Sequence, residues 1–270
     1  MIVNLTRQAT FSAAHACRLE GASEEENRRV FGSASRVHGH NYRVEATLRG
    51  TLDPRTGMVL NMNQVKAALA EATAPLANAW IDRDVPHFQR QPSTTENLVL
   101  YLWGRLLASD LCGALVSLKV AESPDLCSEY RGMADRTVFV TRAYEFSAAH
   151  RLHASGLSDE ENAEVFGKCN NPAGHGHNYG LEVTVRGPVD PRRGTAFDLA
   201  SLDAVVQDRV VARFDHRNLN VDVPEMGGLN PTSENLAVVL WGILREALGD
   251  ALYSVRVVET ARNTFEYRGE

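Results

Sequence analysis

The chain repeats its own sequence motifs, and this repetition constrains the fold more than any other feature. The motif Phe11–His15 recurs as Phe146–His150, and the motif His38–Tyr42 recurs as His175–Tyr179. Three more motifs recur in the same order. Asp53–Arg55 recurs as Asp190–Arg192, and Thr94–Leu98 recurs as Thr232–Leu236. Glu122 followed by Glu129–Gly132 recurs as Glu259 followed by Glu266–Gly269. The offset is 135 residues for the first pair and 137 or 138 afterwards. We therefore interpret the chain as a tandem duplication with units 1–135 and 136–270.

Composition excludes several classes of protein. The net charge is −6 and no block of Lys and Arg occurs, so nothing indicates a nucleic-acid partner. The longest apolar run, Leu236–Leu244, is far shorter than the roughly 20 residues of a membrane span. The N-terminus has no apolar signal core, and the few, irregularly spaced cysteines do not suggest a disulfide framework. We expect a cytoplasmic protein without a membrane partner, and we expect Cys17, Cys112 and Cys127 to be inert packing residues.

The pattern of each half predicts an α+β fold, in the order strand, strand, helix, helix, strand, strand. Residues 42–48 and 179–185 alternate between apolar and polar side chains, which is typical of strands. Helices are predicted over 63–74, 97–108 and 235–248, and buried strands over 117–121 and 254–258. The Asp-Pro-Arg segments are expected to form turns.

Three histidines of the second half form the pattern of a catalytic metal site. His175 and His177 are two apart, so on a strand they share a face, and Gly176 leaves room for close packing. His150 follows the alternating Phe146 and Ala148, which places it on another strand facing inward. Three neutral imidazoles leave a fourth position open on Zn²⁺. A lone His is usually a hydrogen-bonded core or surface residue, but the same trio recurs as His15, His38 and His40.

Several other residues of the second half can carry chemistry. Cys169 lies in a turn-rich loop before His175, where a thiol near a metal can act as a base or nucleophile. Asp215 can orient the imidazole of His216, although a polar cluster at a helix end is the alternative. Glu259 ends a buried strand and can accept two hydrogen bonds from the amino-imino edge of a pterin or guanine, with a simple ion pair as the alternative.

These motifs together resemble the 6-pyruvoyl tetrahydropterin synthase family across essentially the whole second half. The resemblance implies two tandem tunnelling-fold units, each a four-stranded antiparallel sheet with two helices on one face. It also implies a zinc-dependent lyase that acts on 7,8-dihydroneopterin triphosphate, a pterin triphosphate substrate, and eliminates triphosphate. The roles that it implies are zinc binding by the histidine trio, a base at Cys169, a proton relay at Asp215 and His216, and pterin anchoring by Glu259 and Thr232. Family members form rings of three units stacked in pairs, so we expect a homo-oligomer, a trimer of two-unit chains.

The first half departs from the family pattern. It keeps its three histidines, but its loop before His38 is two residues shorter and has no cysteine. Alignment through Asp84 and Asp222 puts Ala77 opposite Asp215 and Asn78 opposite His216. We predict that the first half is degenerate: it can hold a metal but does not catalyse the proton chemistry.

Three alternative functions remain open at this stage. The related 6-carboxytetrahydropterin synthase of the queuosine precursor route uses the same substrate, metal and fold, although its cysteine loop is usually shorter. A zinc hydratase or hydrolase would use the histidine trio and a bound hydroxide without needing Cys169. A non-catalytic pterin or purine-binding scaffold would bind its ligand without turnover.

Overall fold

The computed structural model describes residues 1–111 and 113–270, so the expectation for Cys112 lies outside the described residues. The chain forms two compact units. Unit 1 contains Met1–Val140 and Arg186–Phe197, and unit 2 contains Thr141–Val185 and Asp198–Glu270. A short segment of the second repeat, Arg186–Phe197, therefore belongs structurally to unit 1.

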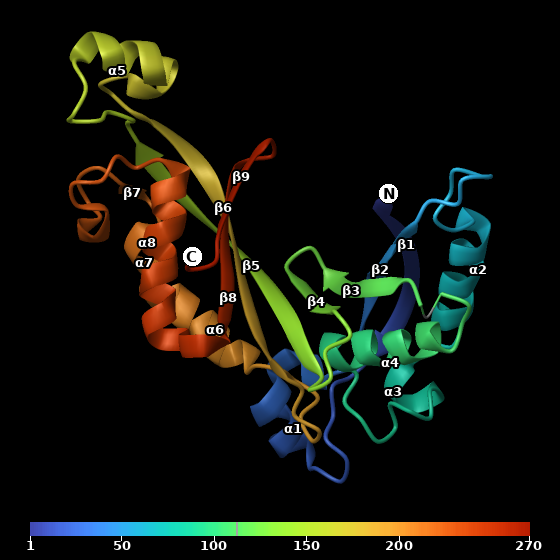
Figure 1. Cartoon of the computed structure of the whole chain (residues 1–270). Coiled ribbons are helices and arrows are strands. Elements are labelled where there is room, and N and C mark those ends of the chain that lie inside the picture. Colours follow the sequence, from blue (N-terminus) through green and yellow to red (C-terminus); the bar gives the residue numbers. More distant parts are fainter. Residues whose placement is uncertain (112) are drawn as a thin grey trace. The chain divides into compact units, whose positions relative to one another are not determined.

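Unit 1 is built on an antiparallel sheet in the order β1-β2-β3-β4 (Figure 1). The strands are β1 (Ile2–His15), β2 (His38–Thr51), β3 (Leu115–Ser123) and β4 (Leu126–Tyr130). The helices are α1 (Glu24–Phe31), α2 (Met62–Thr73), α3 (Ile81–Asp84) and α4 (Thr95–Leu107), with a 3-10 turn, η1, at Gly32–Ser35. Helices α2 and α4 contact each other, and both contact the sheet.

Unit 2 repeats this plan with the order β5-β6-β8-β9. Its strands are β5 (Thr137–His150), β6 (His175–Pro188), β8 (Leu252–Thr260) and β9 (Asn263–Tyr267), and β7 (Arg217–Asn218) pairs in parallel with β5. Of these strands, the first four residues of β5 and the last three of β6 fall within unit 1. Its helices are α5 (Asp159–Phe166), α6 (Leu199–Val206), α7 (Ala212–Phe214) and α8 (Ser233–Leu248). A π-helical segment, η3 (Gln207–Val211), joins α6 to α7, and 3-10 turns lie at η2 (Gly167–Asn170), η4 (Pro224–Met226) and η5 (Gly249–Ala251). The predicted α+β fold with two four-stranded units is confirmed.

The core of each unit follows from the alternation of buried and more exposed side chains along its second strand. In β2 the residues Tyr42, Val44, Ala46 and Leu48 are all fully buried, and residues between them are more exposed. The matching residues of β6 (Tyr179, Leu181, Val183 and Val185) are also fully buried. Since side chains alternate across a strand, one face of each sheet packs against helices. The histidines of the HGH motifs lie on this buried face because they are in phase with Tyr42 and Tyr179.

The two longest helices begin at a polar cap rather than at the first apolar residue. Thr94 and Thr232 are the N-caps of α4 and α8, and each hydroxyl accepts a hydrogen bond from a backbone N–H three residues later, at 3.3 Å in both cases. The helices predicted from residues 97 and 235 therefore start two residues earlier than the apolar pattern indicated.

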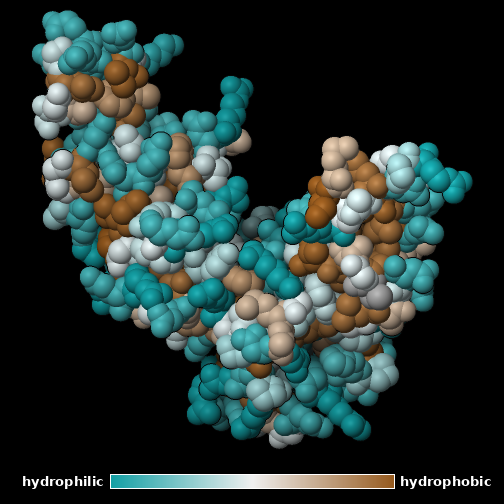
Figure 2. Space-filling view, viewed as in Figure 1, coloured by the Kyte–Doolittle hydropathy of each residue, from teal (hydrophilic) through white to brown (hydrophobic). Residues whose placement is uncertain are grey.

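Two short helices, α1 and α5, were missed by the predicted order of elements. Each buries one asparagine, Asn27 or Asn162, so neither shows the apolar periodicity of a packed helix. Serine caps and acidic first turns stabilise them instead. In Figure 2 the surface over α5 is mainly hydrophilic, as this composition requires. Across the described residues, no helix combines the length and apolar character needed to cross a bilayer.

Candidate metal centres

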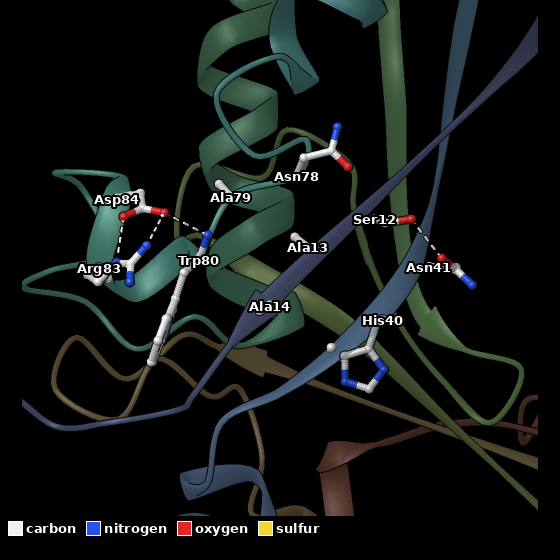
Figure 3. Close-up of a pocket in the computed structure, with 11 residues that line it drawn as sticks. Ser12, Ala13, Ala14, His40, Asn41, Asn78, Ala79, Trp80, Arg83 and Asp84 are labelled. Atoms are coloured by element: carbon white, nitrogen blue, oxygen red, sulfur yellow. Dashed lines mark hydrogen bonds and ion pairs between the residues drawn. The ribbon is translucent and has the colours of Figure 1, made fainter.

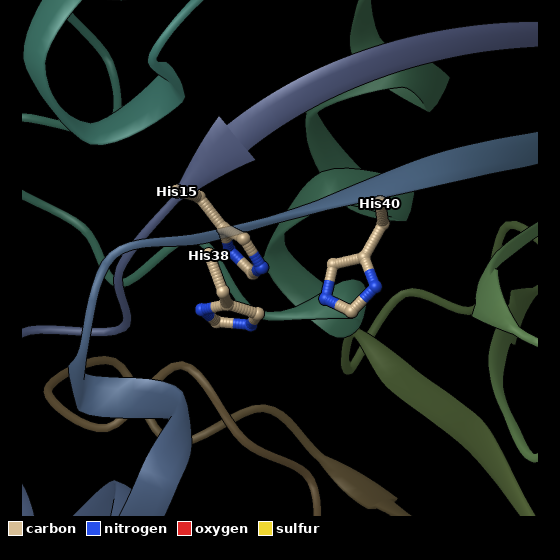
Figure 4. Close-up of side chains that lie close together, drawn as sticks. All are labelled: His15, His38 and His40. Carbon is tan, nitrogen blue, oxygen red and sulfur yellow. The ribbon is translucent and has the colours of Figure 1, made fainter.

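The first-unit trio forms because β1 and β2 pair in a register that brings its histidines together. His15 lies opposite His38, and Ala13 lies opposite His40. The ring of His15 is 4.4 Å from that of His38 and 5.2 Å from that of His40, centroid to centroid (Figure 4). A side chain on Gly39 would approach the carbonyl oxygen of Ala13 to 3.1 Å, so the glycine lets the two strands pack closely here.

The second-unit trio has the same geometry. The ring of His150 is 4.5 Å from that of His175 and 5.2 Å from that of His177. The Nε2 atoms of His150 and His175 are 3.1 Å apart. In each trio one nitrogen per histidine can be chosen so that all three lie within 4.8 Å of one another. The predicted convergence of three histidines from two strands is therefore confirmed in both units, and each trio can hold a metal ion.

The contacts around the trios leave ring nitrogens available to bind a metal ion. The Nδ1 atom of His150 is 2.8 Å from the carbonyl oxygen of Pro231, and Nδ1 of His15 is 3.0 Å from that of Ser93. Such contacts orient a ligating imidazole and leave its Nε2 for the metal. Among the described residues, Nε2 of His15, His40 and His177 is buried without a hydrogen-bond partner.

Burial favours the neutral form of His15, His150 and His175. It lowers the pKa of His15 to about 3, with the neighbouring His38 and His40 adding to the effect. Burial likewise lowers the pKa of His150 and of His175. Neutral imidazole is the form that binds a metal, so each donor set fits a three-nitrogen zinc-type site.

Glu259 lies beside the second trio. Its Oε1 is 3.9 Å from Nε2 of His177, and it accepts a hydrogen bond of 2.8 Å from the hydroxyl of Ser233. The hydroxyl of Thr232 accepts the N–H of Asn235, so this side chain caps α8 at the edge of the site. Sequence reasoning missed Ser233, although the repeated Thr-Thr-Glu-Asn and Thr-Ser-Glu-Asn motifs were the signal that marked it.

Cys169 lies in the 3-10 turn η2, and its carbonyl oxygen accepts the N–H of Leu152 at 2.8 Å. The thiol is partly exposed. In unit 1 the carbonyl of Ala34 accepts the N–H of Cys17, also at 2.8 Å. Ala34 therefore occupies the structural position of Cys169, and the first unit has a methyl group where the second has a thiol.

Asp215 and His216 form a hydrogen-bonded pair. Oδ2 of Asp215 is 2.8 Å from Nδ1 of His216, and its Oδ1 accepts the backbone N–H of Ser147 at 2.7 Å. The bond from Ser147 and the contact with His216 hold the pKa of Asp215 below its usual value. The His216 side chain is 82% exposed and lines a shallow pocket with Ser147 and His177. Among the described residues, no hydrogen bond joins His216 to Cys169.

The same backbone turn exists in unit 1 without these side chains. Asn78 and His216 both adopt a positive φ, of 58° and 56°. Their N–H groups donate to the carbonyls of Ser12 and Ser147 at 2.7 and 2.6 Å. This equivalence supports the alignment of Ala77 with Asp215. Figure 3 shows the resulting pocket of unit 1, where Arg83 and Asp84 pair with each other.

Comparison with known proteins agrees with the motifs. The family described as 6-pyruvoyl tetrahydropterin synthase matches residues 4–133 and again residues 139–270. A 6-pyruvoyl tetrahydrobiopterin synthase of Poecilia reticulata is 49% identical over 138 residues, covering 51% of this chain and 94% of the relative. The protein of the same name from Homo sapiens is 47% identical over 132 residues, covering 48% and 91%.

One similar protein has a solved structure. The 6-pyruvoyl tetrahydropterin synthase of Caenorhabditis elegans is 46% identical, covers 50% of this chain and 96% of its own, and has a TM-score of 0.48. Each of the two relatives from Poecilia reticulata and Homo sapiens corresponds to about half of this chain. The family matches both halves, which confirms the resemblance seen in the motifs, and the chain belongs to the 6-pyruvoyl tetrahydropterin synthase family as a tandem duplicate.

Proposed function

We propose that this chain is a zinc-dependent lyase that converts 7,8-dihydroneopterin triphosphate to 6-pyruvoyl tetrahydropterin with elimination of triphosphate, at the site of unit 2. The observation that carries the proposal is the grouping of the His150, His175 and His177 trio with Glu259, which lies 3.9 Å from His177. The names of the relatives support the reaction, and a donor set of three imidazoles, of which that of His150 is buried, supports zinc. Bound there, zinc would act as a Lewis acid that makes the C–H groups next to side-chain hydroxyls more acidic.

The residues around the trio have separate tasks in this proposal. Glu259, fixed by Ser233, accepts hydrogen bonds from the amino-imino edge of the pterin, and Thr232 stands at the same edge of the site. The Cys169 thiolate removes one proton from the substrate side chain. Asp215, which stays ionised, holds Nδ1 of His216, so that Nε2 of His216 is free to relay another proton. Protons are redistributed within the substrate, and no redox partner is needed.

Unit 1 has no part in this proton chemistry. Ala34, Ala77 and Asn78 stand where unit 2 has Cys169, Asp215 and His216, and none of them can take up a proton near neutral pH. Its trio can still hold a metal. We infer that unit 1 keeps the scaffold and the ligands and that all turnover occurs in unit 2.

The proposal is tested by incubating the full-length protein with 7,8-dihydroneopterin triphosphate and identifying products by mass spectrometry. We expect triphosphate and 6-pyruvoyl tetrahydropterin from the wild type. Cys169→Ala should reduce turnover by roughly a hundredfold or more, as expected for loss of a proton-transfer group. Adding Ala34→Cys to the Cys169→Ala variant is the matched control. A thiol in unit 1 without the acid and the imidazole of unit 2 should not restore turnover.

Three outcomes would point elsewhere. A 6-carboxy product would identify the related carboxy-type synthase. Full activity in Cys169→Ala would favour a metal-hydroxide hydratase or hydrolase, and pterin binding without turnover would favour a scaffold.

A further inference from the structure

The two trios share one arrangement of rings, in which Nε2 faces the metal position and Nδ1 is the outer nitrogen. In the second trio the Nε2 atoms of His150 and His175 are 3.1 Å apart. This is close to the roughly 3.3 Å expected between two nitrogens bound to one tetrahedral zinc ion at about 2.0–2.1 Å. In the first trio Nε2 of His15 and of His40 is the buried atom without a partner, so Nδ1 is again the outer nitrogen. The contact of each outer nitrogen decides how well its ring is oriented toward a metal.

Every ring of the first trio is held by the protein. Nδ1 of His15 is 3.0 Å from the carbonyl oxygen of Ser93 and 3.0 Å from its hydroxyl oxygen. Nδ1 of His38 is 2.7 Å from the carbonyl oxygen of Arg36. The ring of His40 is likewise hydrogen-bonded to a backbone group. The three rings in Figure 4 are therefore fixed in orientation before a metal binds.

The second trio lacks one of these contacts. Among the described residues, Nδ1 of His175 is buried without a hydrogen-bond partner. His150 is held by the carbonyl oxygen of Pro231 at 2.8 Å, but proline has no hydroxyl to match that of Ser93. A hydrogen bond at the outer nitrogen orients the imidazole and makes it a more basic ligand, so loss of such a partner typically weakens metal binding about 10–100-fold.

The loop before each HGH motif explains this difference. In unit 1 the 3-10 turn η1 leads through Arg36, which is extended, directly to the first histidine of the motif. The loop of unit 2 is two residues longer, and Gly174, at a φ of 70°, closes a second turn by donating its N–H to the carbonyl oxygen of Asn171 at 2.8 Å. The longer loop carries Cys169, but among the described residues it supplies no partner for Nδ1 of His175.

We propose that unit 1, which has no part in the proton chemistry, holds the more tightly bound metal ion of the chain and that this ion is structural. Because His38 has an outer partner that His175 lacks, the first site should bind zinc at least about tenfold more tightly than the second. Charge does not offset this difference, since Glu122 and Glu259 occupy equivalent positions in the two repeats. An ion that binds only the folded chain stabilises it, so at limiting zinc unit 1 is stabilised first. This proposal concerns metal affinity and does not depend on the proposed reaction.

Single-site variants of the full-length protein measure the two affinities separately. His150→Ala leaves only the first site and His15→Ala leaves only the second, and metal-free protein is titrated with zinc against a competing chelator of known affinity. We expect a dissociation constant for the first site that is at least about tenfold lower than that for the second. A chelator of intermediate strength should therefore leave one zinc ion per wild-type chain and none in His15→Ala.

Exchange of the loops tests the cause of the difference. In the His15→Ala protein, replacing residues 168–174 by the sequence of residues 33–37 should tighten the remaining second site about tenfold. In the His150→Ala protein, the reverse replacement should weaken the remaining first site by a similar factor. The matched control is the replacement of 168–174 in the His150→Ala protein, which should leave the affinity of the first site unchanged.

Circular dichroism shows which loop-exchanged proteins are folded, and the comparison of the single-site variants decides the ranking even if none is. Equal dissociation constants for the two sites, or a tighter second site, would overturn the proposal. Folded loop-exchanged proteins with unchanged affinities at both sites would overturn the explanation by outer contacts.

Discussion

Removing one histidine from each trio distinguishes the two metal centres. His15 and His150 are the most buried ligands, each 1% exposed, and each is held by a carbonyl at its Nδ1. Replacing either with alanine leaves two imidazoles, too few for a three-nitrogen site. We expect two zinc ions per wild-type chain, one in each single variant, and none in the double variant.

The stability change follows from linkage between binding and folding. With free zinc at about 100 times its dissociation constant, each occupied site adds about 2.7 kcal/mol to the free energy of unfolding. For a unit of roughly 130 residues, 1 kcal/mol shifts the melting temperature by about 4 °C. The zinc-dependent rise should therefore be about 10 °C per unit, and His150→Ala should abolish it for unit 2 alone.

Metal analysis after dialysis and calorimetry with and without zinc measure these quantities. The zinc-dependent part of the melting shift is the quantity to compare, because each variant also leaves a buried carbonyl without its partner, at a cost of about 1–3 kcal/mol. Turnover should be lost in His150→Ala and kept in His15→Ala. Two ions retained in either single variant, or loss of turnover from His15→Ala alone with unit 2 still loaded, would refute this reasoning.

Two further changes test the electrostatics of the site and of the buried start of α4. Asp215→Asn removes the charge that holds His216, so kcat should fall by roughly a hundredfold or more while the melting temperature changes little; an unaltered pH profile of kcat would contradict the relay. Glu96 is buried, and burial raises its pKa, so its ionised form opposes folding at neutral pH. A folded-state pKa above the unfolded value costs stability as pH rises from the unfolded pKa through the folded one. Glu96→Gln should therefore gain stability relative to wild type between about pH 4.5 and neutrality, by about 1.4 kcal/mol for each tenfold difference between the acid dissociation constants of the folded and unfolded states. Parallel pH profiles of unfolding for the two proteins would exclude this effect.

Sequence patterns predicted those parts of the fold that depend on periodicity and repetition. The alternation of β2 and β6 places the HGH histidines on the buried face, and the duplication makes two equal trios. Gly176 was expected to allow close packing, and a side chain there would indeed approach the carbonyl of Ala148 to 3.1 Å. These features are local consequences of residue order, which explains why they could be predicted.

Features that depend on contacts between distant segments could not be predicted in this way. The contact of segment 186–197 with the start of α4 joins residues about a hundred positions apart, through hydrogen bonds of Thr94 and Glu96. The turn residues of this segment predict its own conformation but not the helix that it contacts. The role of Ser233 likewise depends on β8 and α8 lying side by side, which places its hydroxyl 2.8 Å from Glu259. In both cases the sequence showed that the residues are repeated, but it did not show which residues they contact.

Unit 1 keeps the backbone conformation of the site although it lacks the reactive side chains of unit 2. A residue at positive φ strains most side chains, but Asn tolerates this conformation because its short amide can bond locally. Asn78 therefore keeps the turn that His216 makes in unit 2, with the same backbone bond to the neighbouring strand, while it removes the titratable ring. Ala34 likewise keeps the backbone bond made by Cys169 and removes only the thiol. The substitutions that distinguish the units thus spare the scaffold, so restoring chemistry to unit 1 would require Cys, Asp and His together at Ala34, Ala77 and Asn78.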